Sequence, residues 1–584
     1  MSDIPKGGSF LIEDPLSQEV FTPEDFTIEH KMIADTASGF VAKRVIPRMD
    51  ELEAKKEGLT PELLRELGDL DLLSADIPEQ YGGIEVDKIS STIIAEEIGR
   101  TGSFSISHGG QVGIGSLPIV FFGNDAQKRK YLPDIATGKK IAAYALTEPG
   151  AGSDALSLTT KAKLSPDGKF YILNGVKQFI SNAGFADIFI VFAKIDGTKL
   201  SVFIVESNTE GFTTGAEEKK MGLKGSSTRT LFLDDAKVPV ENLLFEIGRG
   251  HVVAFNILNM GRLKTGANSV GAAKYALELS ATHANDRRQF KVPIAQFGMI
   301  KEKIAEMASR LYASESMLYR AAGLVDGIMH GIDTCGPDNC QAIADGIEEY
   351  AIECSMNKVF ATEMLAFAVD EGVQIHGGYG FMSEYPIERL YRDSRIFRIF
   401  EGTNEINRTL IPTLLIRRGS KGQLPLLEAI ENVKRQIGSG IPVRVVTADL
   451  VRAAKDVFLF TLGVGLEKCG ETLTKEQEIL GRLADIAIWA FAMESCWLRA
   501  QKAEQAKGEK AAGLKMKMAK AFINSTMGKL GLAAEQVLAA VSSDNELLQL
   551  RADLAKLMQY TPINNVALNR EIASAISEAG KYVV

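Results

Sequence analysis

The chain has 584 residues, with 66 lysines and arginines against 75 aspartates and glutamates, and so a formal net charge of −9. This length is too great for one hydrophobic core, so about two to four domains are expected, and the 45% apolar and 24% charged residues exclude a disordered chain. The negative balance argues against a nucleic-acid partner, which would favour a basic protein surface.

The N-terminal quarter is expected to be helical. Its first residues are acidic and contain no apolar signal core, so we expect a cytoplasmic protein that is either bacterial or already processed. From about Pro23 to Tyr131 apolar residues recur at helical spacing, and in PELLRELGDLDLLSADIP Pro61 fits a first helical position. The small residues of SISHGGQVGIG (105–115) predict loops.

A run of short β-strands is expected from about Ile141. The segments have alternating or β-branched apolar residues and read LSLTTKAKL, KFYILNGVKQFIS, IFIVFAKI, LSVFIVES and TLFLDDAKV. Three dipeptides predict hairpin turns: Asp167-Gly168, Asn174-Gly175 and Asp196-Gly197. About one hundred residues of β-structure therefore interrupt a helical chain, a suitable size for one small domain.

The helical spacing returns at Gly248 and continues to the end of the sequence. One break falls at RRGSKGQLP (417–425), which is rich in glycine, serine and lysine. The predicted fold class is therefore mainly α with a central β-domain. The predicted domains are an N-terminal helical domain (1–142), a β-domain (143–246), a helical bundle (247–416) and an extra helical domain (425–584).

The five cysteines do not indicate a metal site or a disulfide framework. They lie at positions 335, 340, 354, 469 and 496, with no CxxC pair. We therefore expect reduced and mostly buried thiols. The apolar runs are also shorter than a membrane-spanning helix requires.

A glycine-rich loop in YALTEPGAGSDA (144–155) formally matches GxGxxA. A dinucleotide-binding fingerprint needs a helix directly after the glycines, so that the helix N-terminus meets the pyrophosphate. The following residues, LSLTTKAKL, alternate as in a strand, so we reject that interpretation. An anion-tolerant loop with two hydroxyls, Thr147 and Ser153, and a plain polar turn both remain open.

Six stretches in order make the chain similar to the acyl-CoA dehydrogenase family of flavoproteins. They are YALTEPGAGSD (144–154), FISNAGFADIFIVFAK (179–194), MGLKGSSTRTLFLDDAKVPVENLL (221–244), DRRQFKVPIAQF (286–297), QIHGGYGF (374–381) and RIFRIFEGTNEINR (395–408). The resemblance covers about residues 25–416 and implies an α-helical domain, a β-barrel and a four-helix bundle. The extra domain and NILNMGR (256–262) most resemble the very-long-chain members.

The resemblance implies oxidation of acyl-CoA to trans-2-enoyl-CoA, with FAD as cofactor and electron-transfer flavoprotein as the electron acceptor. It also implies that Glu401, in FEGT, removes the α-proton of the thioester. Desolvation would raise the pKa of this carboxylate and make it a stronger base. In some family members the base is instead the residue directly before an arginine that corresponds to Arg262. This chain has Gly261 at that position, so Glu401 is the one candidate base that the resemblance implies. On pattern alone, a solvated first-turn glutamate is the competing interpretation.

The resemblance also implies roles for other residues. The expected FAD contacts are Tyr144, Leu146, Thr147, Ser153, Phe179, Ser181, Arg287, Gln289, Phe290, Phe297, Gln374, Gly377, Gly378, Thr403 and Asn404. The expected substrate contacts are Ser153, Asn259, Arg262, Phe400 and Gly402. The segments that hold Arg287 and Gln374 match ones that reach a second subunit, which implies a homodimer.

Several features qualify these roles. Phe179 stands where the family usually has tryptophan, Lys291 replaces a usual glycine, and Asn259 replaces an aspartate of medium-chain members. No second ligand accompanies His376 at metal spacing, so no metal is expected. The small residues of 103–115 would leave room for a long fatty-acyl tail.

Three alternatives stay open. An oxidase-type flavoenzyme would react with oxygen, which the sequence does not reveal, although a nitroalkane-oxidase type is disfavoured because it uses aspartate as its base. A non-catalytic assembly protein could share the architecture, although the intact FEGT favours catalysis. For residues 425–584, a peripheral membrane contact is possible, but we favour a solvated helical bundle that shields the core.

Overall fold

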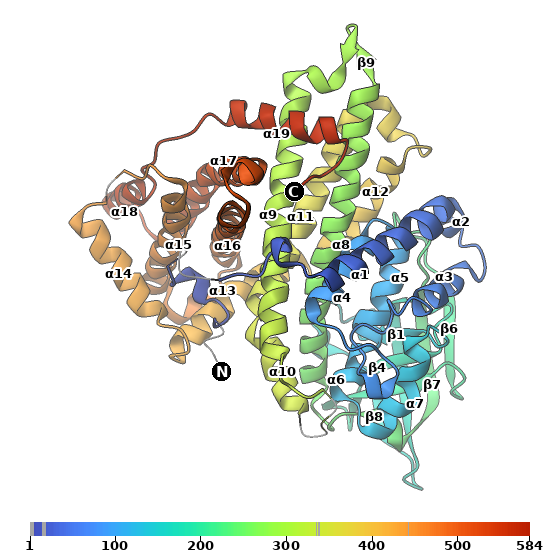
Figure 1. Ribbon diagram of the computed structural model, residues 1–584. Coiled ribbons are helices and arrows are strands. Elements are labelled where there is room, and N and C mark those ends of the chain that lie inside the picture. Colours follow the sequence, from blue (N-terminus) through green and yellow to red (C-terminus); the bar gives the residue numbers. More distant parts are fainter. Residues whose placement is uncertain (1–4, 15–18, 335, 337–338, 442) are drawn as a thin grey trace.

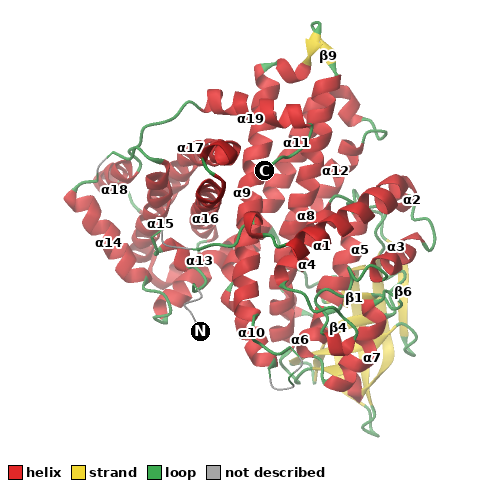
Figure 2. Ribbon diagram, viewed as in Figure 1, coloured by secondary structure: helices red, strands yellow, loops and turns green. Residues whose placement is uncertain are grey.

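The computed structural model describes residues 5–14, 19–334, 336, 339–441 and 443–584. Long helices form the centre of the molecule, the β-domain lies at one end, and the C-terminal helices form a separate lobe on one side (Figure 1). Colouring by secondary structure shows that the larger strands are confined to a single region (Figure 2). The predicted fold class, mainly α with a central β-domain, is confirmed.

The helices before the sheet pack against one of its faces and against the central helices. Their bounds are α1 Ile28–Phe40, α2 Met49–Glu53, α3 Leu59–Gly68, α4 Lys88–Gly99, α5 Ser103–Gly109, α6 Leu117–Phe122 and α7 Asp125–Ala136. Helix α3 begins at Leu59, so Pro61 is its third residue and not the predicted first. Pro61 still lies in the first turn, where the backbone N–H groups have no intrahelical partner and a proline is tolerated.

The expected loops of 105–115 are wrong. Helix α5 continues into a π-helical turn, Gly110–Gly115, and most of this segment is buried. A Cβ atom on Gly110 would lie 2.7 Å from the Asn182 amide nitrogen of the β-domain. The glycines therefore allow close packing of a helix on the sheet, and tertiary contacts override their low helix propensity.

The sheet has eight strands in the order β6-β7-β3-β2-β4-β5-β8, with β1 paired in parallel to β4. The bounds are β1 Ala142–Ala145, β2 Lys161–Leu164, β3 Phe170–Ser181, β4 Ile188–Ile195, β5 Lys199–Glu206, β6 Phe212–Glu217, β7 Thr228–Pro239 and β8 Leu243–Leu244. Ile188, Ile190 and Phe192 of β4 belong to the same buried core as the central helices, so the sheet is anchored to the bundle through them.

Two of the three predicted hairpin turns are confirmed. Asp167-Gly168 joins β2 to β3, and Asp196-Gly197 joins β4 to β5, both antiparallel pairs. Asn174-Gly175 instead lies inside β3, where the pairing with β7 shifts register. The dipeptide forms a β-bulge there and not a hairpin turn. The strand expected over LSLTTKAKL is also shorter than predicted: Ala155–Ser157 forms a 3-10 turn, and only Lys161–Leu164 pairs.

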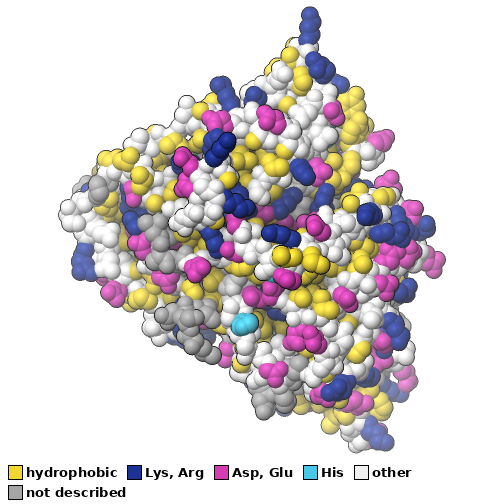
Figure 3. Space-filling view, viewed as in Figure 1, with side chains coloured by type: hydrophobic (Ala, Val, Ile, Leu, Met, Phe, Trp, Pro, Cys, Tyr) yellow, Lys and Arg dark blue, Asp and Glu magenta, His cyan; other side chains and the backbone are white. Residues whose placement is uncertain are grey.

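The central helices follow the sheet and carry a projecting two-stranded hairpin. The bounds are α8 Gly250–Asp286, β9 Arg288–Gln289, β10 Val292–Pro293, α9 Gly298–Met329, α10 Cys340–Glu349, α11 Ala351–His376, α12 Pro386–Ser394 and α13 Asn404–Ser420. Basic side chains cap this projecting end of the molecule (Figure 3). Helix α13 continues to Ser420, so the expected break at 417–425 narrows to 421–425.

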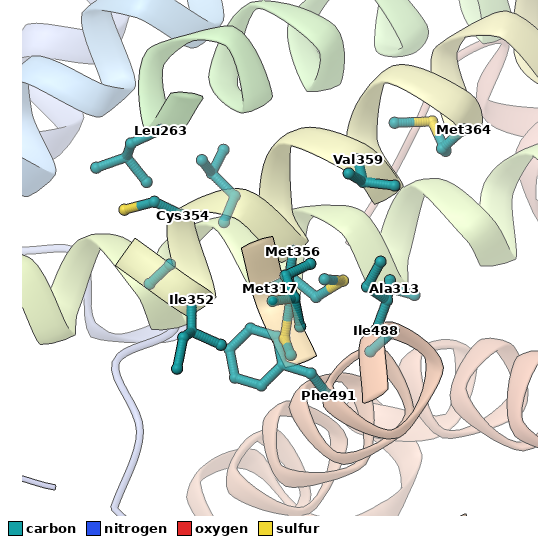
Figure 4. Close-up of a cluster of buried hydrophobic side chains, with 14 of the residues drawn as sticks. Leu263, Ala313, Met317, Ile352, Cys354, Met356, Val359, Met364, Ile488 and Phe491 are labelled. Carbon is teal, nitrogen blue, oxygen red and sulfur yellow. The ribbon is translucent and has the colours of Figure 1, made fainter. Parts of the chain in front are cut away.

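The last helices share one core with the central bundle. Their bounds are α14 Leu426–Ser439, α15 Thr447–Cys469, α16 Gln477–Lys507, α17 Glu509–Val541, α18 Asp544–Leu557 and α19 Asn565–Ala579. Ile488 and Phe491 of α16 lie against the cluster that includes Met317 of α9 and Met356 of α11 (Figure 4). This continuous apolar contact fixes the lobe against the bundle.

The N-terminal segment also joins these two parts. Phe10 packs on Phe491 with ring centroids 4.8 Å apart, and the Gly8 N–H donates to Glu353 of α11 at 2.7 Å. Cys354, Cys469 and Cys496 are free thiols, and Cys335 lies outside the described residues. Among the residues described, no helix is long and apolar enough to cross a membrane, and no cluster of metal-ligating side chains occurs.

Candidate active site

Glu401 lies in a strained loop between a 3-10 turn, Arg395–Arg398, and helix α13. Its φ of 56° is in the left-handed region, and that of Gly402 is 77°. A non-glycine residue in this region costs of order 1–3 kcal/mol and persists only where its surroundings over-determine it. Thr403 caps α13 by accepting a hydrogen bond from the Ile406 N–H at 3.2 Å, so the loop ends at a fixed point.

Three side chains hold the carbonyl groups of this loop. Arg262 Nε donates to the Glu401 carbonyl at 3.2 Å, and Lys358 Nζ donates to the Gly402 carbonyl at 2.8 Å. Asn407 Nδ2 donates to the Gly402 carbonyl at 2.8 Å and to the Thr403 carbonyl at 3.0 Å. The strained backbone is therefore supported from α8, α11 and α13 together.

The Glu401 carboxyl group points into a dry position against α8. Its Oε2 is inaccessible to solvent and has no hydrogen-bond partner within the described residues. A Cβ atom on Gly261 would lie 2.7 Å from this oxygen, so only glycine leaves room for the carboxyl group. Desolvation raises the pKa of Glu401 to about 7, although the positive charges of Arg262 and Lys358 act in the opposite direction. The solvated first-turn glutamate is therefore excluded.

Arg262 is a buried residue and not a surface arginine. The residue is 5% exposed, and its Nη1 donates to Asn259 Oδ1 at 2.8 Å and to Ser355 Oγ at 3.4 Å. Burial lowers its pKa, and the nearby Glu401 opposes that shift. Asn259 thus orients Arg262. Phe400 packs on Phe397, with centroids 5.1 Å apart.

The end of β1 faces the same region. The Tyr144 hydroxyl is buried without a partner in the part of the chain that the structure describes, and burial together with the charge of Glu401 raises its pKa. After β1, Lys177 of β3 donates to the Leu146 carbonyl at 3.2 Å and to Glu148 Oε1 at 2.8 Å. This buried ion pair fixes the loop that begins at Leu146, and sequence reasoning did not identify it.

Phe179 has an unusual conformation for an apolar residue on β3. Its φ is 61°, and its side chain is 58% exposed. The Gln178 N–H donates to the Thr147 carbonyl at 2.9 Å, so the strand is joined here to the loop after β1. The structure thus joins the strand that carries Phe179 and Ser181 to the loop that carries Leu146 and Thr147, and Ser153 is exposed in the same loop.

A second group of predicted residues lies at the other end of the long helices, around the β9–β10 hairpin (Figure 1). A groove of about 510 Å³ is lined there by Arg287, Gln289, Gly377 and Gly378, among others. Phe290 at the hairpin tip is 89% exposed, and its ring centroid lies 6.0 Å from that of Phe297. The first and second groups therefore do not converge within one chain.

Other predicted residues have partners inside the chain. Lys291 adopts φ 71°, a backbone conformation in which a glycine would be unstrained. His376 Nδ1 lies 2.7 Å from the Gly372 carbonyl, and its ring stacks on that of His283 at 4.2 Å. Gln374 is exposed, whereas Asn404 is buried and bonded to neighbouring side chains of α11.

Family models match nearly the whole length of the chain. They are described as the acyl-CoA dehydrogenase N-terminal domain at residues 27–139, the middle domain at 143–236 and the C-terminal domain at 248–415; a further acyl-CoA dehydrogenase C-terminal domain matches 453–556. A probable acyl-CoA dehydrogenase of Bacillus subtilis (strain 168) is 51% identical over 591 residues, covering 100% of this chain and 99% of that protein. The chain belongs to the acyl-CoA dehydrogenase family.

Two further relatives place this acyl-CoA dehydrogenase within the family. The mitochondrial very long-chain specific acyl-CoA dehydrogenase of Rattus norvegicus is 38% identical, over 76% of this chain and 70% of the rat protein. The crystal structure of an acyl-CoA dehydrogenase complexed with FAD from Bacillus anthracis superposes with a TM-score of 0.96 at 51% identity, covering 99% of this chain and 100% of that one. The extra C-terminal domain is thus shared with a solved structure.

Proposed function

We propose that this acyl-CoA dehydrogenase uses FAD to convert fatty acyl-CoA to trans-2-enoyl-CoA in fatty-acid β-oxidation, with Glu401 as the base. One observation carries the proposal: the Glu401 carboxyl group lies in a dry position, with an unpartnered Oε2 and a pKa raised to about 7. A carboxylate with this pKa is suited to accept a proton near neutral pH. Electron-transfer flavoprotein is the proposed electron acceptor.

FAD fits the residues that are present. Phe179 offers an exposed ring on the strand whose Gln178 N–H bonds the Thr147 carbonyl, and the Tyr144 hydroxyl is buried without a partner among the described atoms. When bound, FAD supplies the acceptor for the hydride from the β-carbon of the substrate.

The remaining groups of the site act on the substrate thioester. Glu401 takes the α-proton onto its carboxylate, and the proton transfer is favoured because no other donor competes for Oε2. The backbone N–H of Glu401 is proposed to donate to the thioester carbonyl and so stabilise the developing negative charge. Arg262 and Lys358 hold the carbonyls that follow, so the carboxylate and this N–H keep a fixed relation to each other.

The FAD site is proposed to need two copies of this chain. The second group of residues, around Arg287, Phe290 and Gly377, lies far along the molecule from Phe179 and Tyr144. An exposed aromatic residue at the tip of a hairpin, beside arginine, is suited to reach the cofactor of a neighbouring subunit. A homodimer would complete both sites by symmetry.

A long-chain substrate is the proposed preference, on narrower grounds than the sequence indicated. Asn182 fills the space beside Gly110, so this glycine leaves no room for a fatty-acyl tail. A Cβ atom on Gly109 would meet nothing within 4 Å, so space is open there. A series of saturated acyl-CoA substrates of increasing chain length, assayed with an artificial electron acceptor, tests this preference. Highest kcat/KM for a short-chain substrate would contradict it.

The variant Glu401→Gln tests the proposed base, with Glu405→Gln as its matched control. Glu405 lies one turn further along the same segment and is exposed. We expect Glu401→Gln to retain flavin absorbance and to bind acyl-CoA, but to lose about 10²–10⁴-fold in turnover, the usual contribution of a general base. Glu405→Gln should keep wild-type turnover. Near-wild-type turnover in Glu401→Gln would refute the assignment.

A further inference from the structure

We propose that Asp485, which lies on α16 in the extra C-terminal domain, is a positioning residue for the loop that carries Glu401. The inference rests on the proposed function, in which Glu401 is the base. Asp485 touches no reacting atom; a chain of buried and half-buried polar contacts joins it to the loop. Each contact of that chain is a direct hydrogen bond of ordinary length.

The first link holds the loop itself. Lys358 Nζ donates to the Gly402 carbonyl and to Asn404 Oδ1, both at 2.8 Å. Lys358 and Asn404 are 0% and 2% exposed, so water cannot replace either bond cheaply. The Asn404 amide therefore determines where the Lys358 ammonium can lie beneath the Glu401 loop.

The second link fixes the orientation of Asn404. Its Nδ2 donates to Glu363 Oε1 at 3.0 Å. Glu363 in turn accepts two parallel bonds from Arg408, from Nη1 at 2.7 Å and from Nη2 at 2.9 Å. This two-pronged geometry restricts the rotation of both side chains more than a single bond would.

The third link crosses into the extra domain. Arg408 Nε donates to Asp485 Oδ1 at 2.8 Å, with the Asp485 and Arg408 side chains 14% and 20% exposed. All three nitrogens of the guanidinium group are thus bonded to carboxylates from two different domains. Helix α16 is itself fixed, because Ile488 and Phe491 pack into the bundle core (Figure 4).

The charges along the chain alternate. They run from the negative Glu363 through the positive Arg408 to the negative Asp485. Removing the last charge would leave Arg408 held by Glu363 alone, so the Arg408–Glu363 pair could move as a unit away from Asn404. The loop it supports contains Glu401 at φ 56°, and a strained residue relaxes when its support weakens.

The test is Asp485→Asn in the full-length, FAD-loaded protein, with Asp25→Asn as the matched control. Asp25, in the N-terminal part of the chain, pairs with Lys502, which is also on α16 but lies away from the loop. We expect faster amide hydrogen exchange in a peptide covering 399–408 for Asp485→Asn alone, measured by mass spectrometry. We also expect kcat to fall by about 10- to 10²-fold, as a displacement of about 1 Å does, with KM within about twofold.

The variant Asp485→Glu should recover part of the lost kcat, because it restores the charge opposite Arg408. Unchanged exchange and unchanged kcat in Asp485→Asn would overturn the proposal, and so would equal effects in Asp485→Asn and Asp25→Asn. The exchange measurement does not depend on the chemical role of Glu401. If Glu401→Gln keeps its turnover, the proposed function fails, and exchange at 399–408 still decides whether Asp485 fixes the loop.

Discussion

Gly261→Ala should inactivate the enzyme without unfolding it. The new Cβ atom would lie 2.7 Å from Glu401 Oε2 and 2.8 Å from its Cδ, whereas ordinary contact begins near 3.4 Å. The carboxyl group must therefore move by about 0.5–1 Å, and a misplacement of that size costs about 10²-fold in rate. Replacing glycine by alanine inside a helix also stabilises the folded state by roughly 0.5–1 kcal/mol, which offsets part of the strain.

The assay for Gly261→Ala combines kcat with acyl-CoA and an artificial acceptor, flavin absorbance and the thermal midpoint. Gly528→Ala in α17 is the control, because its Cβ atom would meet nothing within 4 Å. We expect Gly261→Ala to lose about 10²-fold in kcat with a thermal midpoint close to wild type, and Gly528→Ala to keep its kcat. Wild-type kcat in Gly261→Ala, or unfolding before any loss of rate, would refute the reasoning.

Three further predictions follow from the same geometry. Because the pKa of Glu401 is raised to about 7 from 4.5, kcat/KM should rise with pH through about 7. Between pH 4.5 and 7 the folded state keeps a proton on Glu401 that the unfolded state has lost, so the wild type should lose stability relative to Glu401→Gln as the pH rises across this range. A flat profile of kcat/KM and of stability from about pH 5 to 8 would contradict both expectations. Arg287→Ala should release FAD on gel filtration while the chain stays folded, and a monomer that retains stoichiometric FAD would disprove the intersubunit site. Deleting 425–584 should expose the apolar cluster that Phe491 covers and reduce solubility in a sedimentation assay, whereas a soluble, active truncated enzyme would show that the lobe is dispensable.

Much of the fold was encoded in local patterns. The change from helical to alternating spacing near residue 141 and back near 248 identified the β-domain, because these periods reflect which side chains one element buries. The patterns failed where packing decided the outcome. Residues 105–115 are helical because this segment is buried, with Gly110 packed against Asn182, and Asn174-Gly175 forms a bulge because β3 continues past it on β7.

The sequence by itself also marked Glu401, since the residues around it form a recognisable local motif. It did not reveal which groups bury this carboxylate or which charges lie beside it. The pKa of Glu401 depends on its desolvation against Gly261 and on the charges of Arg262 and Lys358. Arg262 lies 139 positions away in the chain, and no local pattern encodes a contact at that separation. Only the tertiary structure brings α8, α11 and α13 together, and burial then turns an ordinary carboxylate into a base suited to neutral pH.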